Sequence, residues 1–250
     1  MSLPSKLQAV VLCGGAGRRL RSVVPDRPKC LAPIGERPFL EYLLLRLRLG
    51  GVTSACLAVG YKRDQIMEHF GCGSRWGISL SYSVEQEPLG TAGALKNAAP
   101  FVERGPFLVL NGDSLLEVPY RDLLQFHEQR QGLATLALCQ VSDVRRYGRL
   151  RIDAEGCVVG YLEKAASTES EDAGPREGLA INGGVYVFRR EIFAEIPDAP
   201  PPVSLETDIF PRLIGRGLLG FLTAGFFIDI GIPEDYQRAQ KELPLRFQPC

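Results

Sequence analysis

Short apolar runs alternate with helical patterns through the first 130 residues, and this alternation limits the fold more than any other feature of the chain. Each apolar run ends in glycine, proline or a polar turn, as is typical of strands buried on both faces. The strand-like runs are residues 7–13, 55–59, 78–84 and 107–110, and the helical patterns are residues 39–49, 64–70 and 91–99. Such alternation predicts an α/β fold with a Rossmann-like, doubly wound, mixed and mostly parallel sheet.

The pattern changes after Gly132, where closely spaced strand-like runs predict a small antiparallel portion. The runs are residues 133–141, 148–153, 158–164, 181–188 and 226–228, and helices are expected at residues 204–214 and 233–242. Residues 165–177 lack a large apolar anchor, so we expect a mobile surface loop there. Because the sequence contains no repeat and no linker, we expect a single domain over residues 1–250, divided near residue 131.

Composition excludes several classes of protein. The 29 Lys and Arg residues balance the 29 Asp and Glu residues, which argues against a broad surface for nucleic acid or an anionic membrane. No run approaches the roughly 18 apolar residues that a membrane helix needs, and no signal peptide is expected. Seven scattered cysteines without a C-x-x-C pair indicate reduced thiols in a cytoplasmic protein, and His69 and His127 have no companion for a metal site.

A glycine loop loaded with arginine follows the first expected strand. It begins at Gly14, Gly15 and Gly17, continues through Arg18 and Arg19, and is followed by Pro28-Lys29. Glycines at the end of a strand let backbone N–H groups approach an anion, and the clustered positive charge suits a polyphosphate. The spacing fits neither a dinucleotide fingerprint nor a P-loop. A tight turn with solvated arginines explains the glycines alone equally well.

Two acidic residues end apolar runs. Asp113 closes the strand at residues 107–110, and Asp229 follows the strand at residues 226–228. Ligands of open α/β sheets gather at the carboxyl ends of strands, and two converging carboxylates would suit Mg²⁺ with phosphate oxygens as further ligands. A turn cap at Asp113 and a paired structural acid at Asp229 are the alternatives.

Three further segments carry polar groups that could contact a ligand. Residues 85–93 form a loop with glycine and proline that leads into a helix, and its Glu or Gln side chains could read the edge of a base. Glu163-Lys164 ends a strand, and Asn182 begins the next one. An ordinary loop, a surface ion pair and a strand-end turn account for them as simply.

Taken in order along the chain, these segments resemble the sugar-1-phosphate nucleotidylyltransferases. The pattern L-A-G-G-x-G-T-R-L…P-K of that family is similar to residues 12–20 and 28–29, with Cys13, Arg18 and Cys30 as departures. The resemblance continues through residues 87–93, 110–113, 147–148, 163–164, 182–184 and 227–231. Within the family, residues 27–29, 37–43 and 227–236 are most similar to the guanylyltransferases of D-glycero-α-D-manno-heptose 1-phosphate.

The resemblance implies a fold of the nucleotide-diphospho-sugar transferase type, with residues 1–131 as the nucleotide-binding half and residues 132–250 as the sugar-binding half. The expected nucleotide-binding residues are Leu12, Gly14, Gly15, Gly17, Arg18, Glu87, Gly90 and Thr91. The expected sugar-binding residues are Asn111, Gly148, Glu163, Lys164 and Asn182. The expected catalytic residues are Arg19, Lys29, Asp113 and Lys164, with Mg²⁺ held by Asp113 and Asp229. The implied reaction is in-line attack of a sugar 1-phosphate on the α-phosphorus of a nucleoside triphosphate, which releases pyrophosphate.

Several functions remain open at this point. A carboxylate at Glu87 would favour GTP, and the resemblance implies the manno-heptose 1-phosphate as the other substrate. Mannose 1-phosphate with GTP, or glucose 1-phosphate with dTTP or UTP, fit the same motifs. A catalytically silent sensor of nucleotide sugars and a glycosyltransferase are further alternatives, although Leu115 stands where an Asp-x-Asp element would place its second acid. The expected partners are the two substrates and, as an open alternative, a second copy of the chain. The resemblance implies a role in polysaccharide biosynthesis.

Overall fold

The computed structural model describes residues 7–15, 17, 20, 23–140, 149–162 and 179–247. Its strands are β1 (Leu7–Leu12), β2 (Pro33–Ile34), β3 (Arg37–Pro38), β4 (Val52–Val59), β5 (Ser79–Val84), β6 (Phe107–Asn111), β7 (Ser114–Leu116), β8 (Ala134–Cys139), β9 (Arg149–Ile152), β10 (Val158–Leu162), β11 (Leu179–Phe188), β12 (Leu218–Thr223) and β13 (Phe227–Asp229). Its α-helices are α1 (Phe39–Leu49), α2 (Arg63–Phe70), α3 (Gly90–Asn97), α4 (Tyr120–Arg130), α5 (Ile192–Glu195), α6 (Phe210–Leu213) and α7 (Pro233–Arg246).

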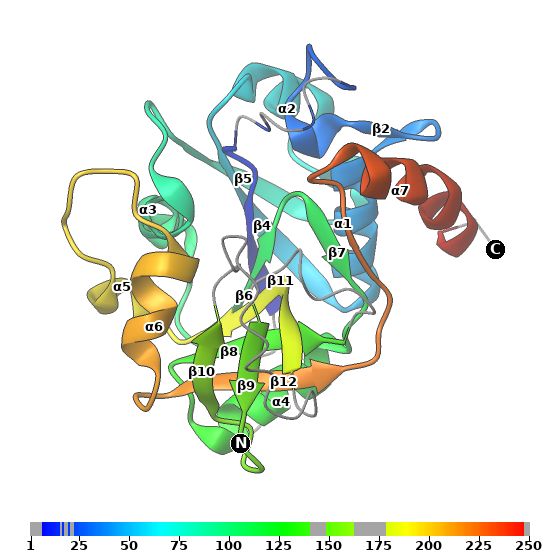
Figure 1. The fold of residues 1–250 in the computed structure, drawn as a ribbon. Coiled ribbons are helices and arrows are strands. Elements are labelled where there is room, and N and C mark those ends of the chain that lie inside the picture. Colours follow the sequence, from blue (N-terminus) through cyan, green and yellow to red (C-terminus); the bar gives the residue numbers. More distant parts are fainter. Residues whose placement is uncertain are drawn as a thin grey trace, which may run out of the picture.

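One mixed nine-stranded sheet forms the centre of the protein (Figure 1). Its main path runs β10-β9-β11-β6-β1-β4-β5, and β8 pairs with both β11 and β12. The strands β6, β1, β4 and β5 are parallel, whereas β11 runs antiparallel to β6, β8 and β9. The predicted α/β fold is therefore confirmed, with a parallel first part and a second part that is antiparallel except for the parallel pair β8–β12.

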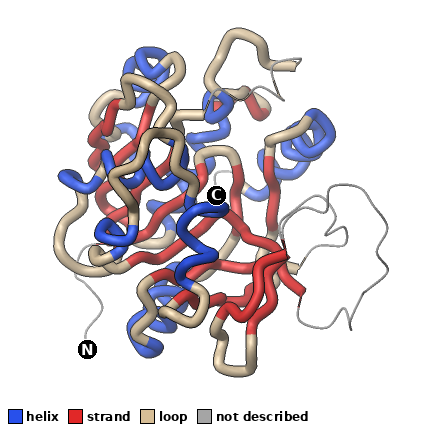
Figure 2. The backbone as a smooth tube through the Cα atoms, turned by 60° about the vertical axis from the view of Figure 1, so that its left-hand side comes forward, coloured by secondary structure: helices blue, strands red, loops and turns tan. Residues whose placement is uncertain are grey.

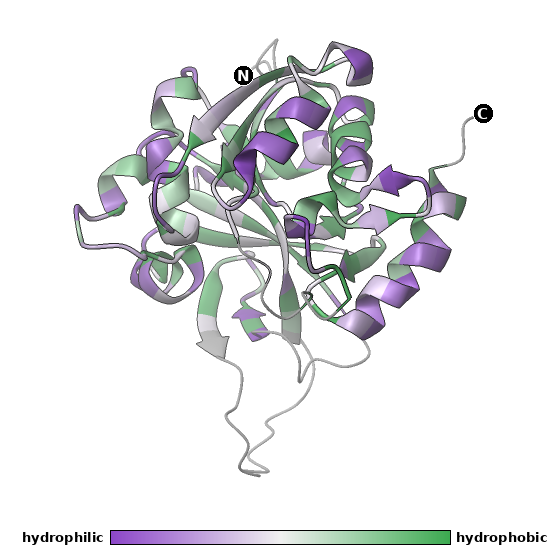
Figure 3. Cartoon of the chain, turned by 90° about the horizontal axis from the view of Figure 1, so that it is seen from above, coloured by the Kyte–Doolittle hydropathy of each residue, from purple (hydrophilic) through white to green (hydrophobic). Residues whose placement is uncertain are grey.

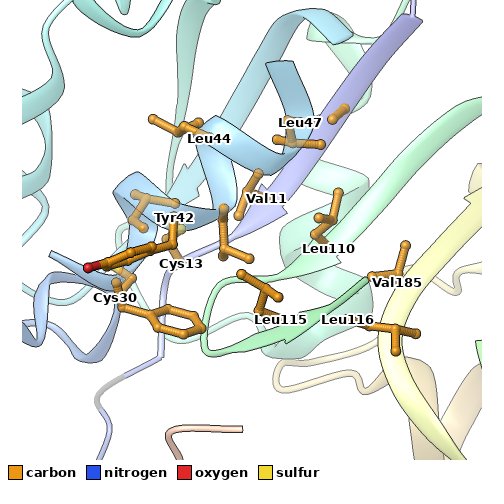
Figure 4. Packing of buried hydrophobic residues seen from close by; sticks show 14 of the residues in the cluster. Val11, Cys13, Cys30, Tyr42, Leu44, Leu47, Leu110, Leu115, Leu116 and Val185 are labelled. Atoms are coloured by element: carbon orange, nitrogen blue, oxygen red, sulfur yellow. The ribbon is translucent and has the colours of Figure 1, made fainter. Parts of the chain in front are cut away.

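Neighbouring residues of the central strands enter two different apolar clusters, one on each face of the sheet. In β1, Ala9 and Val11 belong to the cluster that includes side chains of α1, α2 and α7, whereas Val10 belongs to the cluster with α3 and α6. Figure 2 shows helices around the strands, and Figure 4 shows Leu44 and Leu47 of α1 beside Val11. Because both faces are covered, these strands are apolar at nearly every position.

Most expected elements are confirmed within a few residues, and the helix at residues 39–49 has the observed bounds of α1. The expected helix at residues 204–214 begins at the Ser204 cap, whose hydroxyl accepts hydrogen bonds from the amides of Glu206 and Thr207, and it opens with a π-helical turn. The small strands β2, β3 and β7 and the strand β12 were not predicted. The expected loop at residues 165–177 lies outside the described residues.

Helix α7 is longer than predicted, because its amphipathic pattern continues past residue 242 to Arg246. Its buried residues include Tyr236, Ala239 and Leu243, while Figure 3 shows hydrophilic residues along its outer side. None of the helices in the described parts of the chain combines the length and the apolar character needed to cross a bilayer.

Candidate active site

Two adjoining cavities lie at the carboxyl ends of the parallel strands. The first has a volume of about 250 Å³ and the second about 590 Å³, and Leu12, Gly15 and Asp113 line both of them. The first is also lined by Cys13, Gly17, Lys29, Cys30, Gly112 and Gly231. The second is also lined by Gly14, Gly60, Tyr61, Arg63, Glu85, Gln86, Glu87, Pro88, Gly90, Thr91, Ala94, Asn111 and Pro202. Cavities at this edge of the sheet are where open α/β folds bind ligands.

The glycine loop lies where its backbone lines these cavities, and two of its glycines are required by their neighbours. A Cβ at Gly14 would collide with the carboxylate of Glu85. Gly17 has a φ of +58°, and a Cβ added there would lie only 3.0 Å from the Cβ of Lys29. The expected nucleotide-binding residues Leu12, Gly14, Gly15 and Gly17 thus all line one cavity or both. Arg18 and Arg19 lie outside the described residues.

Lys29, Asp113 and Asp229 form a charged cluster at the first cavity. The ammonium nitrogen of Lys29 lies 2.6 Å from Oδ2 of Asp113 and 3.5 Å from Oδ1 of Asp229. Burial and the neighbouring Asp113 carboxylate raise the pKa of Asp229, while Lys29 and the amide of Gly231 oppose that rise. The structure therefore brings together the three residues that the sequence analysis placed at the reacting phosphates and the metal.

Strand pairing explains why two acids from distant segments meet. Asp113 lies in the turn between β6 and β7, and Asp229 ends β13. In the antiparallel pair β7–β13, Asp229 lies opposite Ser114, the residue that follows Asp113. The amide of Ile230 also donates a hydrogen bond of 2.9 Å to the carbonyl oxygen of Asp113. These backbone contacts hold the two carboxylates at one edge of the cavity.

The residues present fit a magnesium ion that shares its coordination with a substrate. The described residues include no group of three or more His, Cys, Asp and Glu side chains suited to a metal. Mg²⁺ is commonly held by one or two carboxylates together with substrate phosphates and water. Asp113 and Asp229 supply such a pair, and they would leave the remaining positions to a polyphosphate.

Glu85 is a buried carboxylate in the second cavity. It belongs to the loop whose Glu and Gln side chains were expected to read the edge of a base, but the resemblance to the family singled out Glu87 in its place. Glu85 follows β5, is 7% exposed, and accepts a hydrogen bond of 3.3 Å from the amide of Leu89. Burial raises the pKa of Glu85, and the hydrogen bond from Leu89 opposes that rise. Its place directly after a strand, like that of Asp113 after β6, was the signal that could have identified it. Glu87, the expected base reader, lines the same cavity but is exposed.

The loop after Glu87 is fixed by a neighbouring segment. Gly90 has a φ of +79°, and a Cβ there would clash with the carbonyl oxygen of Val203. The hydroxyl of Thr91 donates to Glu206 at 2.8 Å and accepts from the amide of Leu205 at 2.7 Å. Gly90 and Thr91, which the resemblance assigns to the nucleotide, both line the second cavity, and the Thr91 hydroxyl joins α3 to residues 205–206.

The two asparagines expected at the sugar converge on one phenol. The side-chain amides of Asn111 and Asn182 donate to the hydroxyl of Tyr186 at 3.4 and 3.0 Å. Among the described residues, Oδ1 of Asn111 and Oγ of Ser114 are buried without a hydrogen-bond partner. Asn111 also lines the second cavity, so this polar cluster lies beside that cavity. Gly148, Glu163 and Lys164 lie outside the described residues.

Comparison with known proteins identifies the family. Residues 8–245 match the nucleotidyl transferase family. The chain is 39% identical to the D-glycero-α-D-manno-heptose 1-phosphate guanylyltransferase of Aneurinibacillus thermoaerophilus over 95% of this chain and 98% of that protein. It is 35% identical to the mannose-1-phosphate guanylyltransferase of Mycobacterium tuberculosis over 95% of this chain and 65% of that protein. The crystal structure of HddC from Yersinia pseudotuberculosis complexed with GMP-PN superimposes with a TM-score of 0.79 at 35% identity, covering 95% of this chain and 99% of that one. The chain belongs to the nucleotidyl transferase family, and it is a sugar-1-phosphate nucleotidylyltransferase.

Proposed function

We propose that this enzyme transfers GMP from GTP to D-glycero-α-D-manno-heptose 1-phosphate, giving GDP-heptose and pyrophosphate. The observation that carries the choice of base is the buried carboxylate of Glu85 in the 590 Å³ cavity, which adjoins the cluster around Asp113. The guanylyltransferase that matches 95% of the chain and the relative bound to the guanine nucleotide GMP-PN support the same choice.

The chemistry of the base edges explains why a carboxylate favours guanine. Guanine presents two adjacent donors, N1–H and the N2 amino group, which the two oxygens of an ionised carboxylate can accept together. Uracil and thymine offer a single N–H donor at their pairing edge, and adenine places an acceptor at N1. Glu85 would thus bind guanine with two charge-assisted hydrogen bonds and leave the other bases with an unpaired or repelled group.

The residues around the first cavity suit the triphosphate. Backbone N–H groups of Gly14, Gly15 and Gly17 can approach phosphate oxygens because no Cβ stands between them. The ammonium of Lys29 is a point charge that can neutralise the oxygens of the α- and β-phosphates as charge develops. When bound at Asp113 and Asp229, Mg²⁺ would supply positive charge to the same oxygens. An oxygen of the sugar 1-phosphate attacks the α-phosphorus. The bond between the α-phosphorus and the oxygen that bridges it to the β-phosphate breaks, and pyrophosphate leaves.

Asn111 lines the second cavity and shares with Asn182 a hydrogen-bond partner, the buried hydroxyl of Tyr186, and we assign the sugar to this side of the cavity. Mannose 1-phosphate is the second candidate, because a mannose-1-phosphate guanylyltransferase matches 95% of the chain at 35% identity. We place the reaction in the cytoplasm, where the expected reduced cysteines would persist, and we propose that its product supplies polysaccharide biosynthesis.

Pyrophosphate release tests the proposal directly. The enzyme with Mg²⁺ would be offered GTP, ATP, CTP, UTP and dTTP, each paired with manno-heptose, mannose and glucose 1-phosphates. We expect the highest kcat/KM for GTP with the manno-heptose 1-phosphate. A preference for mannose 1-phosphate would move the proposal to the second candidate, and a preference for UTP or dTTP would contradict the assignment of Glu85.

A further inference from the structure

Lys29 lies between the two carboxylates to which the proposed function assigns a divalent ion. Its ammonium nitrogen lies within 2.6 Å of Asp113 and 3.5 Å of Asp229, and its side chain is only 11% exposed. The ammonium therefore fills the space between the carboxylates where their shared ligand would bind. Lys29 cannot contact both acids in this way while an ion occupies that space.

The surroundings of Lys29 fix the start of its side chain beside the glycine loop and place its ammonium beside Gly231. The Cβ of Lys29 packs so closely against Gly17 that a Cβ added to the glycine would lie only 3.0 Å from it. Lys29 also begins the 3-10 turn Lys29–Leu31. At the other end, a Cβ at Gly231 would lie 3.0 Å from the ammonium nitrogen. Lys29, Gly15 and Gly17 also line the same 250 Å³ cavity. Because the four-carbon stem of a lysine is flexible, its rotation would carry the charge from the acids to the side of the cavity lined by Gly15 and Gly17 with the backbone in place.

We propose that Lys29 is an internal substitute for the divalent ion. In the metal-free enzyme its ammonium bridges Asp113 and Asp229, and arrival of the ion releases it toward the nucleotide phosphates. This inference rests on the proposed nucleotidyl transfer at this site. It gives Lys29 two successive partners, and it makes loading of the metal and of the triphosphate favour each other.

The charge balance of the cluster gives the reason for this coupling. Two carboxylates with one ammonium carry a net charge of −1, whereas two carboxylates with a divalent ion are neutral. An ion that enters without a nucleotide leaves the displaced ammonium without a counter-charge in a partly buried cavity, which is unfavourable. A triphosphate in the cavity supplies that counter-charge. Lys29 should therefore weaken the binding of the ion when no nucleotide is present.

Binding of Mn²⁺ in the absence of nucleotide tests the proposal, since Mn²⁺ accepts the same oxygen ligands as Mg²⁺ and its free form is measured by electron paramagnetic resonance. We expect Lys29→Met to tighten Mn²⁺ binding by about tenfold or more. The matched control is Lys96→Met, which removes one positive charge from a pair with the exposed Asp198 and should leave Mn²⁺ binding unchanged. Equal Mn²⁺ affinity in the unsubstituted enzyme and in Lys29→Met would overturn the inference.

Two further outcomes separate this inference from the function on which it rests. If Asp113→Asn in the Lys29→Met background leaves Mn²⁺ binding unchanged, the proposed metal site itself is wrong. The unsubstituted enzyme provides a second readout, because the chain has only six lysines and their ¹³Cε resonances can be followed by NMR, with Lys29→Arg needed only to assign the Lys29 resonance. Addition of Mg²⁺ should shift one resonance, which Lys29→Arg identifies by its loss. A Lys29 resonance that does not move when Mg²⁺ binds would contradict the proposal.

Discussion

The amide of Ile230 donates a hydrogen bond of 2.9 Å to the carbonyl oxygen of Asp113. This bond extends the pairing of β7 with β13 and places Asp229, the residue before Ile230, beside Asp113. The two acids are thus positioned by backbone contacts, which do not depend on the charge of either side chain. The consequence is that either acid can be neutralised without removing the contacts that place it.

Neutralising either acid should therefore abolish turnover while the protein stays folded. Asp113→Asn and Asp229→Asn are each expected to lower kcat for pyrophosphate release by about a hundredfold or more. Each change removes one of the two carboxylates proposed to hold Mg²⁺ beside the reacting phosphates. Thermal unfolding by circular dichroism checks the fold. Asp198→Asn is the control, since this aspartate is 97% exposed and pairs only with Lys96 among the ion pairs of the described residues. Near-normal turnover in both active-site variants would exclude them from the metal site.

Base selection should depend on Glu85 and much less on Glu87. Glu85→Gln replaces a carboxylate, whose two oxygens can accept from guanine N1–H and N2–H, by an amide with one acceptor oxygen. The kcat/KM for GTP should therefore fall by about tenfold to a hundredfold, as for loss of a charged hydrogen bond. The preference for GTP over ATP should narrow with it. Glu87→Gln is the matched control, because Glu87 lines the same cavity but is exposed. The opposite ranking of the two variants would return base recognition to Glu87.

Buried His127 should make the protein less stable in acid. Its Nδ1 lies 2.8 Å from the hydroxyl of Thr135, and the residue is fully buried. Burial, with a smaller effect of the positive charge of Arg189, lowers the pKa of His127 to about 4. In the unfolded chain the pKa of this histidine is near 6.5, so the unfolded chain binds the proton more readily than the folded protein. The free energy of unfolding is therefore highest above pH 6.5 and falls as the pH is lowered toward 4.

The size of this loss can be measured by urea unfolding. The difference in pKa corresponds to about 3 kcal/mol lost from the free energy of unfolding between pH 7 and pH 4. His127→Asn removes the ionisable ring, so the fall in stability over this interval should be smaller in the variant than in the unsubstituted protein. Parallel curves for the two proteins would show that His127 does not contribute.

Gly90 should be needed for both stability and nucleotide binding. Gly90→Ala places a methyl group against the carbonyl of Val203 at a φ of +79°, whereas Gly215→Ala has a φ of +74° with no atom near the new methyl group. Gly215→Ala should cost about 1–2 kcal/mol of unfolding free energy for the backbone conformation alone. Gly90→Ala should cost about 1–3 kcal/mol more and weaken GTP binding, because overpacking displaces the wall of the second cavity. Equal losses of unfolding free energy in the two variants would show that Val203 moves away from the new methyl group without an energetic penalty.

The sequence predicts elements whose signals are local, and α1 illustrates this. Its apolar spacing and the Gly50-Gly51 pair after it define both ends. By contrast, β12 was not predicted, because its apolar residues lie next to glycines. It becomes a strand through parallel pairing with β8, which is far away in the chain. The same limit applies to β7, which becomes a strand through its pairing with β13.

The candidate site divides in the same way. Asp113 and Asp229 could be selected because each follows an apolar strand, but their contact with Lys29 depends on the long-range pairing of β7 and β13. Glu85 directly follows β5, which is a signal in the sequence, but the loop path after the strand decides that Glu85 is buried and Glu87 exposed. Arg19 and Lys164 stay predictions, since both lie outside the described residues.

In the proposed reaction, the protein joins the α-phosphate of GTP to a sugar 1-phosphate at the Lys29–Asp113–Asp229 cluster. The most direct measurement follows GTP labelled with ³²P at the α-phosphorus during incubation with the manno-heptose 1-phosphate and Mg²⁺. The account predicts that the label appears in GDP-heptose in a one-to-one ratio with released pyrophosphate, and that Asp113→Asn removes both products together. Label recovered as GMP or left in GTP, also when mannose or glucose 1-phosphate replaces the manno-heptose 1-phosphate, would contradict it.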